Sequence, residues 1–185
     1  MKTTILSAAI ALLALPAFAQ DPSPDFSGAY VSLNFSRSNS SSSNAVNAAT
    51  SKSSDPSLTL GYGVDLGGLV VGGELVHRRS NYSGTIVATG AAFDGKITGN
   101  SVGVKLGYPV GRAMPFISAR VGQGTDKFAT GSMDLRSSEL TLGAEYALTD
   151  KISTIVSYEH ITLNYDNSPL TVTSNHIGLG LAYRF

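Results

Sequence analysis

The clearest structural pattern in the chain lies in its last ten residues, His176-Ile-Gly-Leu-Gly-Leu-Ala-Tyr-Arg-Phe185. Every second residue from Ile177 to Phe185 is apolar, and the residues between them are glycine, alanine or arginine. Side chains of a β-strand point alternately to its two faces, so a period of two collects the apolar residues on one face. The sequence therefore predicts a terminal strand with one apolar face and one small or polar face.

The same alternation recurs upstream of this strand. Seven further segments repeat it: 28–35, 58–66, 69–78, 102–108, 117–122, 139–148 and 152–159. The third and seventh are the least regular of the eight, because Val70, Val76, Ile155 and Ile161 fall on the other face. Eight short strands with alternating faces and no helical period predict an all-β chain.

The connections alternate in length. The polar stretches 37–55, 79–95, 126–134 and 163–173 are long or moderate, whereas 67–68, 109–114 and 149–150 are short. In an up-and-down meander, all long connections lie at one end, as in transmembrane barrels, whereas nothing obliges a soluble β-sandwich to alternate its loop lengths. We therefore expect an eight-stranded antiparallel up-and-down transmembrane β-barrel.

The two faces allow two assignments. The apolar face could fill a soluble lipocalin-type barrel, or it could face lipid and leave the polar face to line the lumen. Lipid is favoured because the polar face is rich in glycine, which suits a narrow lumen, and because aromatic residues gather near the strand ends, as they do at membrane interfaces. These aromatic residues are Tyr108, Phe116, Tyr146 and Phe185 at the end with the short turns, and Phe35, Tyr82, Phe128 and Tyr165 at the other end. The residues expected to face outward include Leu33, Leu60, Leu106, Leu142, Val156 and Leu179.

The first residues have a different character. Met1-Lys2 is a positive start, 5–15 is an apolar run, and Ala17-Phe18-Ala19 is a small-x-small cleavage site. Residues 1–19 are therefore expected to be a cleaved signal peptide, and residues 20–185 the outer-membrane barrel domain. The run is too short for a transmembrane helix, and Pro16 interrupts it.

Composition excludes several functions. Thirteen basic and thirteen acidic residues cancel, which argues against a nucleic-acid binder, because such a protein needs a basic surface for the phosphates. The absence of cysteine excludes disulfides and cysteine zinc sites. The three histidines, His77, His160 and His176, lie on different expected strands, so neither a metal nor another cofactor is expected. The serine-rich tract 40–54 could be an adhesive loop, but its composition is more typical of a flexible connector.

These features resemble the small OmpA-type and opacity-type outer-membrane β-barrels of Gram-negative bacteria. The resemblance covers residues 26–185 and is most specific in the last strand; Phe26-Ser-Gly-Ala-Tyr-Val31 and Gly143-Ala-Glu-Tyr146 are similar to an opening and an internal strand. It implies a cell outer-membrane location, a monomer, contact with outer-membrane lipid and lipopolysaccharide, and recognition of the terminal strand by the barrel-assembly machinery. The assembly-signal residues are then Ile177, Leu179, Leu181, Tyr183 and Phe185. The resemblance does not extend to the periplasmic peptidoglycan-binding domain of full-length OmpA-type proteins, so it does not imply tethering to the cell wall.

The charged residues of the polar face form the candidate site. They are Asp65, Glu74, Arg78, Lys105, Arg120, Glu139, Glu145, Glu159 and Arg184. Glu74, Lys105, Arg120 and Glu145 should lie at similar depth on four neighbouring strands and pair across adjacent strands, with Glu139 and Glu159 in the same network. An isolated buried ion is very costly, so a salt-bridge plug is a better interpretation than an ion-conducting site.

The sequence predicts a non-enzymatic membrane protein with a structural and surface-presenting role, whose exposed loops alone could carry specificity. The alternatives are a narrow porin-like channel or an adhesin-like binder of surface ligands or host receptors. A third alternative is a lipid A-modifying enzyme with a Ser-His-Glu type triad around His160. That triad is disfavoured because the neighbouring hydroxyl is Thr162 and Glu159 points to the other face.

Overall fold

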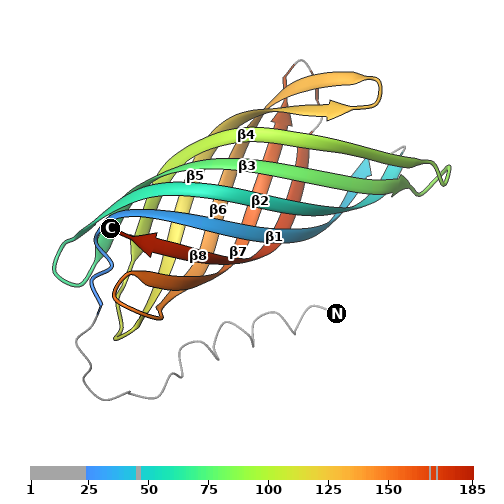
Figure 1. Cartoon of the computed structure of the whole chain (residues 1–185). Helices are drawn as coiled ribbons and strands as arrows, with labels where there is room; N and C mark the ends of the chain where they lie inside the picture. Colours follow the sequence, from blue (N-terminus) through green and yellow to red (C-terminus); the bar gives the residue numbers. More distant parts are fainter. Residues whose placement is uncertain (1–23, 45–46, 167, 170) are drawn as a thin grey trace.

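The computed structural model describes residues 24–44, 47–166, 168–169 and 171–185. They form one closed barrel, in which each strand pairs with its sequence neighbours and β1 pairs with β8 (Figure 1). All eight pairings are antiparallel, which confirms the predicted fold. The strands are β1 (Gly28–Asn44), β2 (Asn47–Asp65), β3 (Val70–Ile86), β4 (Ala92–Gly107), β5 (Ala113–Phe128), β6 (Gly131–Ala147), β7 (Ile152–Tyr165) and β8 (Thr171–Arg184).

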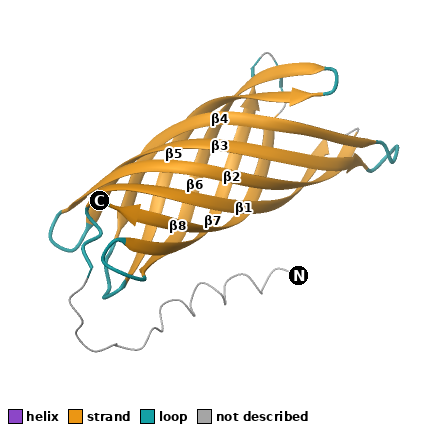
Figure 2. Ribbon diagram, in the orientation of Figure 1, coloured by secondary structure: helices purple, strands orange, loops and turns teal. Residues whose placement is uncertain are grey.

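Two ends of the barrel are distinguished by their connections (Figure 2). The turn end carries the β2–β3, β4–β5 and β6–β7 turns and the C-terminus; the hairpin end carries the other connections. At the turn end, Gly67 and Gly68 adopt positive φ values of 84° and 98°, and the Asp65 carboxylate accepts both of their N–H groups at 2.8 Å. The prediction that Asp65 is a lumen charge is therefore wrong, because its exposed side chain caps this turn.

The polar stretches expected as connections are mostly strand. Pairing continues to Asn44↔Asn47, Thr85↔Ala92, Phe128↔Gly131 and Asn164↔Thr171. The described residues of the serine-rich tract, 40–44 and 47–54, are thus paired in β1 and β2, which contradicts their interpretation as a flexible connector. The sequence does not indicate these extensions, because their outward residues are polar. The alternation of apolar and polar residues therefore ends before the strands end.

The outer face changes character along the barrel axis. Toward the turn end it is an apolar belt, and the six residues predicted to face outward are all exposed there, from 43% for Leu106 to 67% for Leu33. Toward the hairpin end the outward residues are polar; they include Arg37, Lys52, Arg79, Lys127, Arg136 and Asn175. We call these two parts of the barrel the belt half and the hairpin half. On β8 the belt runs from Ile177 to Phe185, which matches the roughly 9–11 residues that a transmembrane strand needs.

Half of the predicted aromatic girdle lies inside the barrel instead. The Phe116 ring contacts the Lys105 ammonium, Tyr82 and Tyr165 hydrogen-bond to Asp126, and Phe128 lines an internal cavity. Each of these residues is an odd number of positions from an outward residue on its strand, so strand alternation turns it inward. Phe35, Tyr108, Tyr146 and Phe185 do face outward, as predicted.

No helix within the described ranges is long and apolar enough to cross a membrane. The expected signal peptide, residues 1–19, lies outside the described residues.

Candidate functional site in the barrel lumen

The turn end of the lumen is closed by apolar side chains. Phe26, Val70, Met114 and Ala147 form a buried cluster, each with at most 4% of its surface exposed. Gly107 makes room for it, since a Cβ atom at this position would lie 2.5 Å from Met114 Sδ. Phe26 precedes β1, so the chain entering the barrel supplies part of its own seal.

A first charged layer lies beside this cluster, centred on Glu145. Glu145 is 1% exposed; its Oε2 accepts the Lys105 ammonium at 3.1 Å, and its Oε1 accepts Arg184 Nη2 at 2.9 Å. The Lys105 Nζ also lies 4.3 Å from the centre of the Phe116 ring, a cation–π contact. Two cations share one carboxylate here, so this layer has an excess of positive charge.

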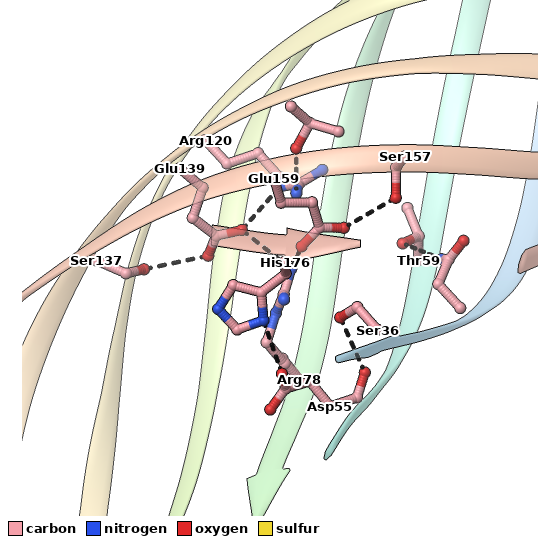
Figure 3. A network of polar contacts seen from close by, with 12 residues as sticks. Ser36, Asp55, Thr59, Arg78, Arg120, Ser137, Glu139, Ser157, Glu159 and His176 are labelled. Atoms are coloured by element: carbon pink, nitrogen blue, oxygen red, sulfur yellow. Dashed lines mark hydrogen bonds and ion pairs between the residues drawn. The ribbon is translucent and has the colours of Figure 1, made fainter. Parts of the chain in front are cut away.

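A second charged layer joins four strands around Arg120 and Arg78 (Figure 3). Arg120 donates to Glu139 Oε2 at 3.0 Å and to Glu74 Oε2 at 3.3 Å. Arg78 Nη2 lies 2.7 Å from Glu159 Oε2 and 3.3 Å from Glu139 Oε2. Glu139 therefore links the two guanidinium groups, and the layer forms one continuous network.

The expectation that Glu74, Lys105, Arg120 and Glu145 lie at similar depth and pair across adjacent strands is wrong: they divide between the two layers, and neither of their pairs joins adjacent strands. Arg120 and Glu139 do come from neighbouring strands, β5 and β6. Lys105 instead reaches Glu145 from β4 to β6, and Arg120 reaches Glu74 from β5 to β3. In a barrel of eight strands the interior is only wide enough for side chains to fill, so long Lys and Arg side chains bridge strands that are not hydrogen-bonded neighbours.

The sequence reasoning missed a buried contact between Asp55 and His176. His176 Nδ1 lies 2.7 Å from Asp55 Oδ2, and its Nε2 lies 2.7 Å from the Ser174 hydroxyl. The sequence predicts a connection at Asp55 and no metal site at His176, and it indicates no contact between the two residues. Strand alternation carries the signal for both, since each side chain immediately precedes an outward residue, Pro56 or Ile177.

The charged layers leave little empty space. A cavity of about 30 Å³ lies among Tyr30, Glu74, Lys105, Arg120 and Glu159. Such a volume holds roughly two water molecules at most. Below the hairpin half, the lumen is thus occupied by paired side chains.

A much larger cavity opens above them. The hairpin half encloses about 660 Å³, within the roughly 300–1,000 Å³ of small-molecule sites. We call this cavity the vestibule. Its walls are largely apolar and include Phe93, Ile97, Phe128, Met133, Leu135, Ile161, Leu163 and Val172. Asp55, Arg78, Glu139 and His176 also line it, so it meets the second charged layer.

The remaining candidate residues lie on the outer surface. His77 and His160 are exposed, and each ring Nδ1 hydrogen-bonds to an asparagine of the next strand, Asn100 at 2.9 Å and Asn175 at 2.8 Å. Within the described residues, no group of three histidine or carboxylate side chains is placed to hold a metal ion. Ile177, Leu179, Leu181, Tyr183 and Phe185 form the outward face of β8.

Comparisons with known proteins agree with this architecture. The family described as "Outer membrane protein beta-barrel domain" matches residues 5–185. Neisserial surface protein A is 16% identical with a TM-score of 0.63, covering 86% of this chain and 98% of that one. OprG of Pseudomonas aeruginosa is 14% identical with a TM-score of 0.51, covering 86% and 96%. A search of the curated proteins finds no match.

At these identities the two solved structures show the fold alone. The family match extends over nearly the whole sequence, including all eight strands. The closed barrel, its apolar outer belt and the buried charged pairs in its lumen are what that family leads one to expect. The chain belongs to the outer-membrane protein β-barrel domain family.

Proposed function

We propose that this protein is a sealed structural barrel that presents its hairpin half at the cell surface and passes no solute through its lumen. The main support for the proposal is the pair of charged layers. In these layers Glu145, Arg120 and Arg78 each form an ion pair with a residue of another strand across the lumen. Moving an ion along the axis would require these buried contacts to separate, and an uncompensated buried charge is costly. The same layers disfavour the porin-like alternative.

The outer surface supports this orientation. The apolar belt fits the hydrocarbon of the outer membrane, and in such barrels the longer connections lie on the extracellular side. Arg37, Lys52, Arg79, Lys127 and Arg136 are exposed on the outer surface of the hairpin half. Basic side chains in this position suit the phosphate groups of lipopolysaccharide, which we propose as the partner of this surface.

Conductance in planar bilayers tests the seal. We expect the wild type to give no steady conductance. Replacing both charged layers by serine, at Glu74, Arg78, Lys105, Arg120, Glu139, Glu145, Glu159 and Arg184, together with Phe26→Ser and Met114→Ser in the apolar cluster, removes all three closures and should admit ions. The control removes the exposed pair Arg136–Asp166, whose atoms lie 3.6 Å apart on the surface, and should stay silent. A steady wild-type conductance would overturn the proposal.

The outward face of β8 is proposed to be the assembly signal. The support is its run of exposed apolar residues ending in Phe185, which is 75% exposed and packs edge-on against Tyr183 at 5.2 Å. We expect Phe185→Asp, or deletion of 183–185, to abolish accumulation in the outer membrane. Phe185→Ala should affect refolding into detergent less, because the strand ladder remains.

Membrane fractionation of cells measures accumulation, and heat-dependent gel mobility measures refolding. Phe35→Asp serves as the matched control, because Phe35 is also an exposed aromatic residue of the belt but lies on β1. Normal outer-membrane levels of the Phe185→Asp protein would contradict the assembly role. We also propose a monomer, because closure of β1 onto β8 leaves no strand edge for a second chain.

A further inference from the structure

The hairpin half has the residue distribution of a soluble ligand-binding barrel rather than of a membrane barrel. Its outward residues are polar, whereas the inward residues of β4 to β8, among them Leu135 and Ile161, give the vestibule an apolar wall. The opposite wall, from β1 to β3, is lined mainly by serine. Eight-stranded barrels of this kind have an interior that can hold one small ligand. Apolar side chains that line an unfilled cavity lack packing partners, and an apolar ligand would supply them.

One wall of the vestibule is aromatic and ends in a buried carboxylate. The Tyr82 and Phe93 rings lie 6.3 Å apart and are tilted by 57°. Tyr82 donates its hydroxyl to Asp126 Oδ1 at 2.9 Å, and Tyr165 donates its own to Asp126 Oδ2 at 2.9 Å. Asp126 is only 4% exposed, yet no Lys or Arg of the described residues forms a salt bridge with it.

A second carboxylate at the base of the vestibule is also incompletely satisfied. Asp55 is fully buried; its Oδ2 contacts His176 and Ser53, but its Oδ1 has no hydrogen-bond partner. Buried charged oxygens normally have partners, so this one marks a position where a donor is missing. Two buried donors at the same base, Arg78 Nε and Nη1, also lack hydrogen-bond partners, so Asp55 favours neither sign of charge. The preference for a positively charged occupant rests on Asp126.

The charge balance around the vestibule leads to the same conclusion. Its lining and the layer beneath it contain five carboxylates and two guanidinium groups. The carboxylates are Asp55, Glu74, Asp126, Glu139 and Glu159, and the guanidinium groups are Arg78 and Arg120. Even a protonated His176 leaves negative charge in excess. A cleft with one sign of charge and low-dielectric walls focuses its field, so it attracts cations and repels anions.

We propose that the vestibule binds an organic cation with an apolar body, such as an aryl-alkyl amine. The body would lie along the apolar wall around Ile97 and Leu135. The ammonium group would lie against the faces of Tyr82 and Phe93, near the Asp126 carboxylate. Aromatic faces attract cations within about 6 Å, and the attraction grows when water is excluded. This site goes beyond the sealed barrel proposed above and does not depend on whether the lumen conducts.

Three probes of nearly equal size separate charge from hydrophobicity: phenylbutylamine, phenylbutanol and phenylbutyrate. Their binding is measured calorimetrically to the wild-type barrel in zwitterionic lipid nanodiscs, with empty nanodiscs as the blank. We expect saturable one-to-one binding of the amine, about tenfold weaker binding of the alcohol, and weaker binding still of the carboxylate. Equal binding of all three probes, or no saturable amine binding, would overturn the proposal.

Two matched pairs of variants locate the site. Asp126→Asn should weaken amine binding about tenfold, because it removes the charge and keeps an acceptor, whereas Asp134→Asn on the exposed outer face should leave it unchanged. Ile97→Trp should weaken binding by occupying the apolar wall on which the body of the amine would lie, whereas Thr98→Trp points outward and should not. Undiminished amine binding in both Asp126→Asn and Ile97→Trp would overturn the site, provided both proteins show folded heat-dependent gel mobility.

Discussion

The belt half and the hairpin half are built from the same eight strands in the same register, yet their faces are reversed. In the belt half the outward residues are apolar and the lumen is filled with paired charges. In the hairpin half the outward residues are polar, and the lumen has an apolar wall on the side of β4 to β8. The enclosed volumes differ accordingly, about 30 Å³ against about 660 Å³.

This difference shows that the surrounding solvent determines the polarity of the outward residues, whereas the inward residues can be either polar or apolar. Lipid requires apolar residues outside, so the belt half obtains its internal contacts from charges paired across the lumen. Water requires polar residues outside, so the apolar residues of the hairpin half face inward. They do not meet across the axis, however, and the space between them remains open.

The largest expected effect is electrostatic and belongs to the belt half. Glu145→Gln leaves Lys105 and Arg184 buried without a counter-charge, so the free energy of unfolding should fall by about 3–5 kcal/mol. Asp126→Asn in the hairpin half removes a charge that has no salt-bridge partner among the described residues; it should cost only about 1 kcal/mol. Urea titration of the refolded barrels measures both changes. Equal losses would show that the two halves do not differ in their electrostatics.

The next effect concerns the outer face of a single strand. Leu142→Arg places a charge in the belt and should cost about 2–4 kcal/mol near the bilayer midplane. Ser138→Arg lies on the same face of β6 but beyond the belt, so it should be nearly neutral. The two variants are compared by unfolding in lipid vesicles. A neutral Leu142→Arg would contradict the position assigned to the membrane.

The smallest effect compares packing in the two lumens. Ser118 is 1% exposed, so its surroundings leave no space for a larger side chain. Ser118→Leu should therefore destabilise the barrel by about 1–3 kcal/mol through overpacking. Ser51 lines the vestibule, where Ser51→Leu should find space and change stability little. Thermal unfolding followed by gel mobility distinguishes them. If Ser51→Leu is as costly as Ser118→Leu, the vestibule is not open space.

The sequence predicts the barrel well wherever one face is apolar. The belt strands were identified because lipid imposes a strict period of two, and the same period identified Glu145 and Arg120 as lumen residues. It does not reveal the strand extensions around Ser53 or Thr85, where polar outward residues and small inward residues alternate without contrast. The sequence also does not predict which lumen charges pair with each other, because the pairing depends on how far the side chains reach across the barrel axis rather than on strand order.

The closure of β1 onto β8 has a consequence for the order of folding. Arg184 on β8 bonds to the Ser27 carbonyl, 157 positions earlier in the chain, and also to Glu145. A contact between residues so distant in sequence forms only after the intervening chain has lost conformational entropy, so it stabilises the barrel late in folding. The first charged layer, with its two cations, is therefore complete only after β8 has paired with its neighbours. A partly inserted sheet would still lack the ion pair between Arg184 and Glu145.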